Sequence, residues 1–477
     1  MQTNFIANQD RPSVQGRTLD VIDPSDGKVF DQLQRSSAAD IDLAVRAARS
    51  AFDGAWGKLN AAERGRLLQR LSQRVRDAAA ELSALEQRDC GKPTKQAQAD
   101  AAALARYFEF YAGTCDKLHG ETLPYLDGYS VLTWREPHGV TGHVIPWNYP
   151  MQIFGRSVGG ALAAGNACVV KPAEDACLSL LRVAQLAAEV GFPPGAINIV
   201  TGYGHEVGDA LARHPGIQHL SFTGSPNVGT LIQQAAAERH CPVTLELGGK
   251  GPQVVFADAD VDAALPAIIN AIVQNAGQTC SAGSRLLVQR SLYEAVLERL
   301  GTAFSQLRAG PAVRDLDLGP LIRANQLERV RGFLDQARAD RIPVVAQGQV
   351  VPDAPEGGFY HAPVLLRDVP VQHRLAQEEV FGPVLAAMSF DDEDDAVRLA
   401  NATRYGLVAG VWTRDGARQL RMARRLQFGQ VFVNNYGAGG GVELPFGGVK
   451  SSGHGREKGF EALYSFTTLK TVAIRHG

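Results

Sequence analysis

The fold of this chain is decided by a series of short apolar runs that begins with Val140-Thr141-Gly142-His143-Val144-Ile145. A stretch with helical spacing follows each run before the next one starts. The further runs of this series are residues 167–171, 197–200, 219–222 and 243–247. Strands that alternate with helices in this way predict an α/β fold with a parallel, doubly wound sheet. A nucleotide would bind at the carboxyl ends of these strands.

A second series of apolar runs follows the Gly-rich segment Gly248–Gly251. Its members are residues 253–256, 285–288, 363–366, 408–412 and 430–433. This pattern predicts a second α/β domain, with the boundary near the Gly-rich segment. Because Glu246 and Cys280 lie on opposite sides of that boundary, we expect an active site between the two domains.

Two helical segments carry boundary signals. Apolar residues recur at helical spacing through residues 61–90, and Gly91 follows as a stop signal, which predicts one amphipathic helix. The acidic run Asp391–Asp395 predicts a solvated helix start, because carboxylates stabilise the N-terminal end of a helix.

Residues 121–135 hold two β-prone runs around Asp127-Gly128, which is a signal for a hairpin with a two-residue turn. The C-terminal residues 463–474 are also strand-like. A hairpin of two strands is only marginally stable by itself, so these segments are expected to pack on something else. That partner is either the same chain or another copy.

Composition excludes several classes of protein. The chain has 477 residues, of which 45% are hydrophobic and 21% charged, and this predicts a globular protein of two or three domains. A net charge of -2 gives no electrostatic signature of nucleic-acid binding. The longest weakly polar run, residues 158–170, is shorter than the roughly 20 residues of a membrane span.

The N-terminal segment has neither the basic start nor the apolar stretch of a secretion signal. The six cysteines form no CxxC pairs and have no histidines at metal-ligand spacing, so no metal site is expected. Scattered cysteines fit a reducing compartment, and we expect a cytoplasmic protein.

The motif Gly277-Gln278-Thr279-Cys280 and the segment Glu246–Lys250 pair a thiol with a carboxylate. A thiol must lose its proton before it attacks a carbon, and a carboxylate can later deprotonate the water that releases an acyl group. The alternative is that Cys280 is a small buried residue without a chemical role.

Six motifs together resemble, in order and spacing, those of the NAD(P)-dependent aldehyde dehydrogenase superfamily. They are residues 146–150, 222–225, 246–250, 277–280, 378–383 and 445–453. The likeness extends from about residue 20 to the C-terminus. It implies a Rossmann-like coenzyme domain (1–118 and 138–249), a catalytic domain (250–450) and a small β oligomerisation arm (119–137 and 462–477). The resemblance also implies a homodimer or homotetramer.

By this resemblance, Cys280 is the nucleophile and Glu246 is the general base. Asn148 matches the side-chain amide that stabilises the oxyanion together with the backbone N–H of Cys280. Glu457 matches a second carboxylate that relays protons, although Ser157 stands where many relatives have a lysine.

The resemblance assigns the coenzyme to both domains. Lys171 and Glu174 match residues that hold the adenine-side ribose, and a carboxylate at 174 would repel the 2′-phosphate of NADP. We therefore expect NAD, with NADP as the weaker alternative. The remaining expected coenzyme residues are Ile145, Pro146, Trp147, Phe222, Thr223, Gly224, Ser225, Leu247, Gly248, Glu379 and Phe381.

The expected substrate is a small-molecule aldehyde with polar character. The residues that match the aldehyde channel are Tyr149, Arg156, Gln274, Thr279, Ser281, Phe446 and the loop 436–441. Arg156 matches the arginine that binds the distal carboxylate in succinate semialdehyde dehydrogenases, but Gln274 and Gly441 replace two partners of that subgroup. Candidates are ω-carboxy semialdehydes and aromatic or heteroaromatic aldehydes. The alternative role for Arg156 is a structural ion pair.

Two other functions compete with this interpretation. A CoA-acylating relative passes the acyl group to a thiol and has no need of Glu246. A non-catalytic scaffold or crystallin-like binding protein would be expected to lack Cys280, Glu246 or Asn148, and this chain has all three.

Overall fold

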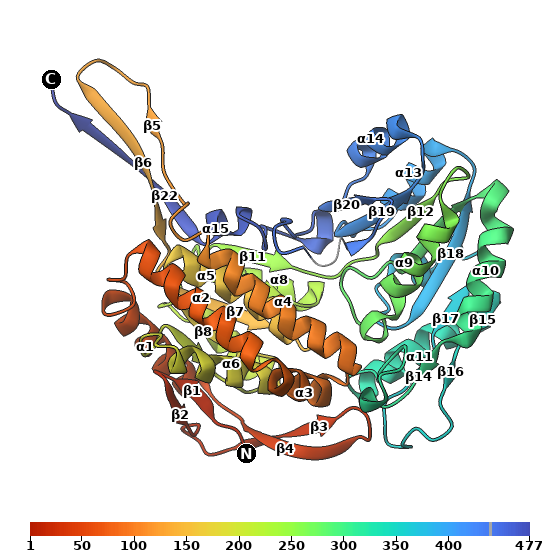
Figure 1. Ribbon diagram of the computed structural model, residues 1–477, viewed down its shortest axis with the longest axis horizontal. Helices are drawn as coiled ribbons and strands as arrows, with labels where there is room; N and C mark the ends of the chain where they lie inside the picture. The colour runs from red at the N-terminus through yellow and green to blue at the C-terminus, as the bar shows by residue number, and fades with distance from the viewer. Residues whose placement is uncertain (438–440) are drawn as a thin grey trace.

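The structure is a computed structural model of the chain, and it describes residues 1–437 and 441–477 (Figure 1). Two α/β bodies lie side by side, and a narrow β-arm projects from the first of them (Figure 1). This arrangement confirms the predicted fold class.

The first body is built on an eight-stranded sheet whose five central strands are parallel. In order across the sheet, these strands are β9 (Ile197–Ile199), β8 (Ala167–Pro172), β7 (Val140–Ile145), β10 (His219–Thr223) and β11 (Val243–Glu246). Numbered along the chain, the order is 3-2-1-4-5, as in half of a dinucleotide-binding fold. Short strands complete both edges: β1 (Asn4–Ile6), β2 (Gln9–Arg11) and β21 (Gly453–His454).

Helices cover this sheet and have the boundaries that their sequences favour. They are α1 (Ala38–Asp53), α2 (Ala61–Asp77), α3 (Ala79–Cys90), α4 (Thr94–Ala112), α5 (Pro150–Ala164), α6 (Leu178–Glu189), α7 (Asp209–Arg213) and α8 (Pro226–Ala237). Helix α5 begins with Pro150 at its first position and ends at Gly165 in a left-handed conformation. A hairpin, β3 (Thr18–Asp23) and β4 (Lys28–Gln34), forms a separate small sheet.

The second body has a seven-stranded sheet that is parallel except for one edge strand. Across the sheet, the strands are β15 (Val344–Gln347), β17 (Val364–Leu366), β18 (Val384–Phe390), β13 (Arg285–Gln289), β12 (Pro252–Val255), β19 (Val408–Trp412) and β20 (Gln430–Val433). The helices are α9 (Val261–Val273), α10 (Tyr293–Gln306), α11 (Ala324–Ala339), α12 (Arg374–Gln377), α13 (Glu393–Asn401) and α14 (Gly416–Arg425). Strands β14 (Arg308–Ala309) and β16 (Gln349–Val350) pair with each other. Asp392 caps α13, so the predicted helix start in the acidic run is confirmed.

Each body has its own apolar core. One core draws its residues from the chain before 248 and from a few positions after 441, and the other draws on residues 254–426. The chain therefore returns to the first body after β20, where β21 pairs with β11. This return places Glu457 next to the first sheet, where it contacts Ser221 of β10, although the preceding strand β20 belongs to the second body.

The arm consists of β5 (Thr122–Leu123), β6 (Tyr129–Pro137) and β22 (Thr467–Arg475). The C-terminal strand pairs antiparallel with β6 along its whole length. The expected two-residue turn at Asp127-Gly128 is wrong, because Leu123 pairs with Val131 and leaves a longer loop between them.

Three further expectations need correction. Residues 61–90 form two helices separated at Ala78, whose backbone is not helical. Residues 463–465 belong to helix α15 (Glu461–Ser465), and the strand starts at Thr467. Strand β18 was missed because its buried run is rich in Ala, Leu and Met, which favour helices when read without their tertiary partners.

Candidate active site

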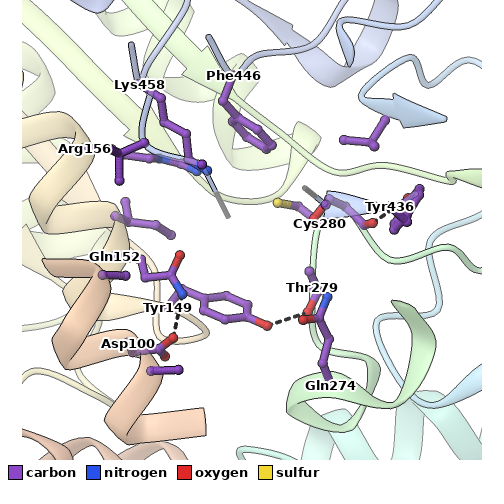
Figure 2. Close-up of a pocket in the computed structure, with 18 of the residues that line it drawn as sticks. Asp100, Tyr149, Gln152, Arg156, Gln274, Thr279, Cys280, Tyr436, Phe446 and Lys458 are labelled. Carbon is purple, nitrogen blue, oxygen red and sulfur yellow. Dashed lines mark hydrogen bonds between the residues drawn. The ribbon is translucent and has the colours of Figure 1, made fainter. Parts of the chain in front are cut away.

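A cavity of about 720 Å³ has Cys280 in its wall (Figure 2). Its lining comes from α4, α5, α9, the Cys280 loop, β20 and the segment after Val442. All six single residues that were expected to contact the substrate line this cavity, although they come from different parts of the sequence: Tyr149, Arg156, Gln274, Thr279, Ser281 and Phe446. Residues 438–440 of the expected loop lie outside the described residues, whereas Tyr436, Gly437 and Gly441 contribute to the wall.

The loop before Cys280 is strained and firmly held. Residues 275–277 are three consecutive left-handed residues, with φ of 48°, 52° and 74°. Such a conformation costs about 1–3 kcal/mol for each non-glycine residue unless its surroundings impose it. The side chain of Asn275 donates to the carbonyl of Asn148 at 2.9 Å, and Gln278 Oε1 accepts from the Ile322 N–H at 2.9 Å. These bonds fix the loop that presents the thiol.

Asn148 lies beside the nucleophile. It is buried, and its Nδ2 donates to the carbonyl of Gln278 at 3.0 Å. A side-chain amide carries two protons, so one remains for a second acceptor. The backbone N–H of Cys280 donates to no acceptor within the described part of the chain. The two donors can therefore serve one oxyanion.

The electrostatics of the Cys280 thiol favour the neutral form. Burial raises the pKa of Cys280 to about 11, and the guanidinium of Arg156 opposes this rise. A thiol with such a pKa attacks a carbonyl only when a neighbouring base accepts its proton.

Glu246 is the last residue of β11, and only 2% of it is exposed. Neither carboxyl oxygen has a hydrogen-bond partner among the described residues. Burial raises the pKa of Glu246 well above its usual range, and the charge of Arg156 limits the rise. Gly447 approaches closely, since a Cβ there would lie 2.9 Å from Oε1 of Glu246. An unsatisfied buried carboxyl with a raised pKa is the arrangement that a general base requires near neutral pH.

Arg156 forms an ion pair with Glu457. Its Nε donates to Oε2 of Glu457 at 2.5 Å, and its Nη2 donates to Oγ1 of Thr223 at 3.1 Å. The guanidinium also lies over the ring of Phe446, 4.8 Å from the centroid. Arg156 thus lines the cavity while its charge is engaged inside the protein, which is the structural role that the sequence left open.

A chain of hydroxyl groups supports Glu457 from behind. Oε1 of Glu457 accepts from Ser221 at 2.6 Å, and Ser157 donates to Ser221 at 2.8 Å. Nδ1 of His143 lies 2.6 Å from the Ser157 hydroxyl, and burial lowers the pKa of His143 to about 3. Ser157 therefore takes a place in the network around Glu457, where a lysine was expected from the resemblance.

The first half of the expected coenzyme site lies where the strand order reverses, between β7 and β10. Residues 145–147 follow the carboxyl end of β7, and residues 223–225 follow β10. Ser225 caps α8, its hydroxyl accepting from the Val228 N–H at 3.4 Å. A helix N-terminus at a switch point is a favourable site for a pyrophosphate.

At the end of β8, the ammonium of Lys171 lies 2.8 Å from Oε2 of Glu174. Burial acts against ionisation of Glu174, but Lys171, a backbone hydrogen bond and the charge of Arg323 together outweigh it, so the pKa of Glu174 lies below its usual range. Glu174 is therefore an anion at neutral pH, with one oxygen bound to Lys171.

The second half of the expected coenzyme site comes from the other body. Oε1 of Glu379 accepts from the Gly249 N–H at 2.9 Å, and a side chain at Gly248 would collide with the Glu379 carboxyl. The ring of Phe381 stands perpendicular to that of Trp147, with centroids 5.4 Å apart. The structure thus brings residues of both bodies together, and the backbone cradle, the helix terminus and the carboxylates fit a dinucleotide.

Sequence reasoning missed a buried charge cluster below the cavity. Lys92 is fully buried, lies 2.6 Å from Glu86, forms an ion pair with Asp100, and its Nζ is 4.2 Å from the centroid of Tyr149. The Tyr149 hydroxyl is in turn 3.0 Å from Oγ1 of Thr279 (Figure 2). Only the acidic residues Glu86 and Asp100 among buried helical positions could have signalled this cluster, since Lys92 lies in the loop between α3 and α4.

Within residues 1–437 and 441–477, no group of three or more His, Cys, Asp or Glu side chains could hold a metal ion. Over the same residues, none of the helices has both the length and the apolar character needed to cross a bilayer.

The comparisons with known proteins agree with this site. The family model described as the aldehyde dehydrogenase family matches residues 11–472. A crystal structure of a Burkholderia cenocepacia protein, assigned as an aldehyde dehydrogenase, is 72% identical with a TM-score of 0.99 and covers 100% of both chains. PnpE from Pseudomonas sp. WBC-3, solved with nicotinamide adenine dinucleotide, is 39% identical with a TM-score of 0.97, covering 100% of this chain and 98% of PnpE. The Saccharomyces cerevisiae protein named aldehyde dehydrogenase NAD(P)+ 2 is 37% identical over an alignment of 478 positions, which covers 98% of this chain and 94% of the yeast protein.

Proposed function

This chain belongs to the aldehyde dehydrogenase family, and on that premise we propose that it oxidises an aldehyde to a carboxylic acid through an acyl-enzyme on Cys280. One observation carries the proposal: the Cys280 loop and the Asn148 amide meet in the wall of one cavity between two bodies, and the unsatisfied carboxyl of Glu246 lies close enough to Cys280 to raise the pKa of its thiol. Membership in the family means that the enzyme uses NAD(P) and acts on a small-molecule aldehyde.

The residues divide the reaction between them. The Cys280 sulfur adds to the carbonyl carbon as its proton passes to the Glu246 carboxylate and from there to solvent, and the resulting oxyanion receives hydrogen bonds from Asn148 and the Cys280 backbone N–H. When bound, the nicotinamide supplies the hydride acceptor that turns this adduct into a thioester. Glu246 then takes a proton from water, the hydroxide adds to the thioester, and the carboxylic acid leaves as Cys280 regains its proton.

Glu246 also supports hydrolysis over transfer of the acyl group to CoA, because its raised pKa suits the activation of water near neutral pH. Glu457 holds Arg156, and through Arg156 it affects the charge balance at Glu246 and Cys280. We infer a positioning role for Glu457 beside its expected part in proton relay.

We infer that NAD is preferred over NADP. The Glu174 carboxylate at the end of β8 can accept hydrogen bonds from ribose hydroxyls and would repel a 2′-phosphate. PnpE was solved with nicotinamide adenine dinucleotide, whereas the yeast relative's name admits both coenzymes, so the inference is a preference.

We propose a homodimer or homotetramer assembled through the arm. Several large apolar side chains of the arm are exposed: Tyr125, Leu126, Trp134, Leu469 and Ile474. An apolar surface on a thin projecting element is typical of a protein interface. Light scattering of the full chain and of a Trp134→Lys variant tests this, since the variant should have the lower mass.

A cytoplasmic location is supported by the cysteines. All six are free thiols, and five of them are buried. Free buried thiols are typical of a reducing compartment.

The substrate is proposed to be a polar aldehyde, either an ω-carboxy semialdehyde or an aromatic or heteroaromatic aldehyde. The support is a cavity wall with Gln152, Gln274, Thr279 and several charged side chains. The test is NADH formation, followed at 340 nm, with a panel of neutral, carboxylated and aromatic aldehydes. Turnover that survives in Cys280→Ala would refute the proposed chemistry.

A further inference from the structure

Lys458 is a cation of the cavity wall to which neither the motifs nor the reaction steps assign a role. Its side chain lies near Arg156 and Phe446 (Figure 2). Its Nζ is 5.4 Å from the Phe446 centroid and 5.9 Å from that of Tyr107. Cys280 lies in the wall of the same cavity. A substrate that reacts at Cys280 therefore lies in the cavity whose wall includes Lys458.

The backbone fixes the direction of this side chain. Lys458 has φ of 61°, a left-handed conformation that is uncommon for any residue with a side chain other than Asn, Asp or His. Hydrogen bonds hold the segment in place: Phe446 N–H to Glu457 O at 2.6 Å, Glu457 N–H to Phe446 O at 2.8 Å, and Gly459 N–H to Val442 O at 2.8 Å. A residue held in such a conformation at a cavity is a candidate for function.

Burial and the charge of Arg156 make the ammonium of Lys458 costly when no anion lies beside it. Burial, followed by the neighbouring charge of Arg156, lowers the pKa of Lys458 to about 8, while Cys280, Glu246 and Glu457 act in the opposite direction. Arg156 already engages Glu457 and Thr223 with its guanidinium. An ammonium has three donor protons, so Lys458 can contact a ligand in addition to any partner in the protein.

We propose that the Lys458 ammonium binds a carboxylate of the aldehyde substrate and so selects carboxylated aldehydes. This inference rests on the proposed oxidation at Cys280 and names the substrate class of that site. An anion beside Lys458 offsets the cost of burial and the repulsion by Arg156, whereas a neutral aldehyde does neither. Arg156 forms part of the cavity wall, and Lys458 forms the ion pair with the substrate carboxylate.

The test compares matched aldehydes on one enzyme. The pairs are 4-carboxybenzaldehyde with its methyl ester, and succinate semialdehyde with butanal, assayed by NADH formation. A charge-assisted hydrogen bond is worth a factor of roughly 10 to 150 in kcat/KM. Lys458→Met should lower kcat/KM for the carboxylated member by that factor and leave the neutral member within about threefold. Methionine keeps an unbranched side chain up to the position of Cε and removes only the ammonium, so it places no new atom near the strained backbone.

Two further variants test whether the charge of Lys458 causes the preference for carboxylated aldehydes. Lys458→Arg should restore most of the preference, because it restores the charge. Lys117→Met removes one exposed lysine, with 64% of its side chain accessible, and should leave the preference unchanged. In the wild type, KM for the carboxylated aldehyde should rise as pH increases through about 8, where Lys458 loses its charge, and KM for the ester should not.

Equal losses for both members in Lys458→Met, or a wild type without preference for the carboxylate, would overturn the inference. If Lys458→Met does not fold, a pH profile of KM that is the same for acid and ester overturns it as well. Absence of turnover with every aldehyde would instead contradict the proposed function, so the two failures are distinguishable.

Discussion

Replacing Arg156 with methionine is predicted to destabilise the protein rather than to change its choice of substrate. The side chains of Arg156 and Glu457 are 7% and 0% exposed, and their ion pair measures 2.5 Å. Removing one partner of a buried pair leaves the other charge without its counter-ion and costs about 3–5 kcal/mol. The loss also removes a charge that opposes the raised pKa of both Glu246 and Cys280. The acid limb of the kcat/KM profile should therefore move to higher pH.

The assay is urea unfolding of the wild type, Arg156→Met and the matched control Arg106→Met. Arg106 pairs with Glu443, and the two side chains are 44% and 51% exposed. An exposed pair contributes about 0.2–1 kcal/mol, so the control should unfold close to the wild type. If Arg156→Met is as stable as the control and loses activity only with carboxylated aldehydes, then Arg156 is a substrate ligand and the reasoning is refuted.

Other variants test single residues. Asn148→Ala should lower kcat by roughly 100- to 1,000-fold, the usual scale for one oxyanion donor, and a loss below tenfold would remove Asn148 from the oxyanion site. Glu174→Gln should move the ratio of kcat/KM for NAD and NADP toward NADP; an unchanged ratio would show that the carboxylate does not cause the preference. Glu246→Gln should unfold like the wild type below pH of about 4.3, the usual pKa of an unfolded Glu. Because the pKa of Glu246 is raised in the folded state, the wild type loses stability as the pH rises above the unfolded value. The melting temperature of the variant minus that of the wild type should therefore increase with pH until the folded pKa is passed. A difference in melting temperature that does not depend on pH would contradict the raised pKa.

Much of the fold could be predicted from short-range patterns. The strands from Val140 to Glu246 have buried apolar runs between helical stretches, and their ends agree with the predicted ones to within a residue or two. Sequence patterns failed where a tertiary partner decides the structure. The break at Ala78 and strand β18 are examples, because the helix-favouring residues of β18 become a strand only between β17 and β13.

The residues of the candidate site also fall into those that the sequence identified and those that only the structure shows. The family resemblance identified Cys280, Asn148 and Glu246 as candidates, and the structure brings the surrounding residues to one cavity. The partners of Arg156 could not be read from the sequence, since Glu457 lies 301 residues further along the chain. Lys92 and Lys458 were missed because neither stands in a motif, and their burial and backbone conformation are visible only in three dimensions.

The most direct test of the account is the mass of the Glu246→Gln enzyme after it is mixed with benzaldehyde and NAD. The account predicts a burst of one NADH per active site, followed by slow turnover, and a mass increase of one acyl group that maps to Cys280. Cys280→Ala is the matched control and should show neither burst nor adduct. Loss of burst and steady state in equal proportion, with no adduct on Cys280, would contradict hydrolysis of a thioester by Glu246.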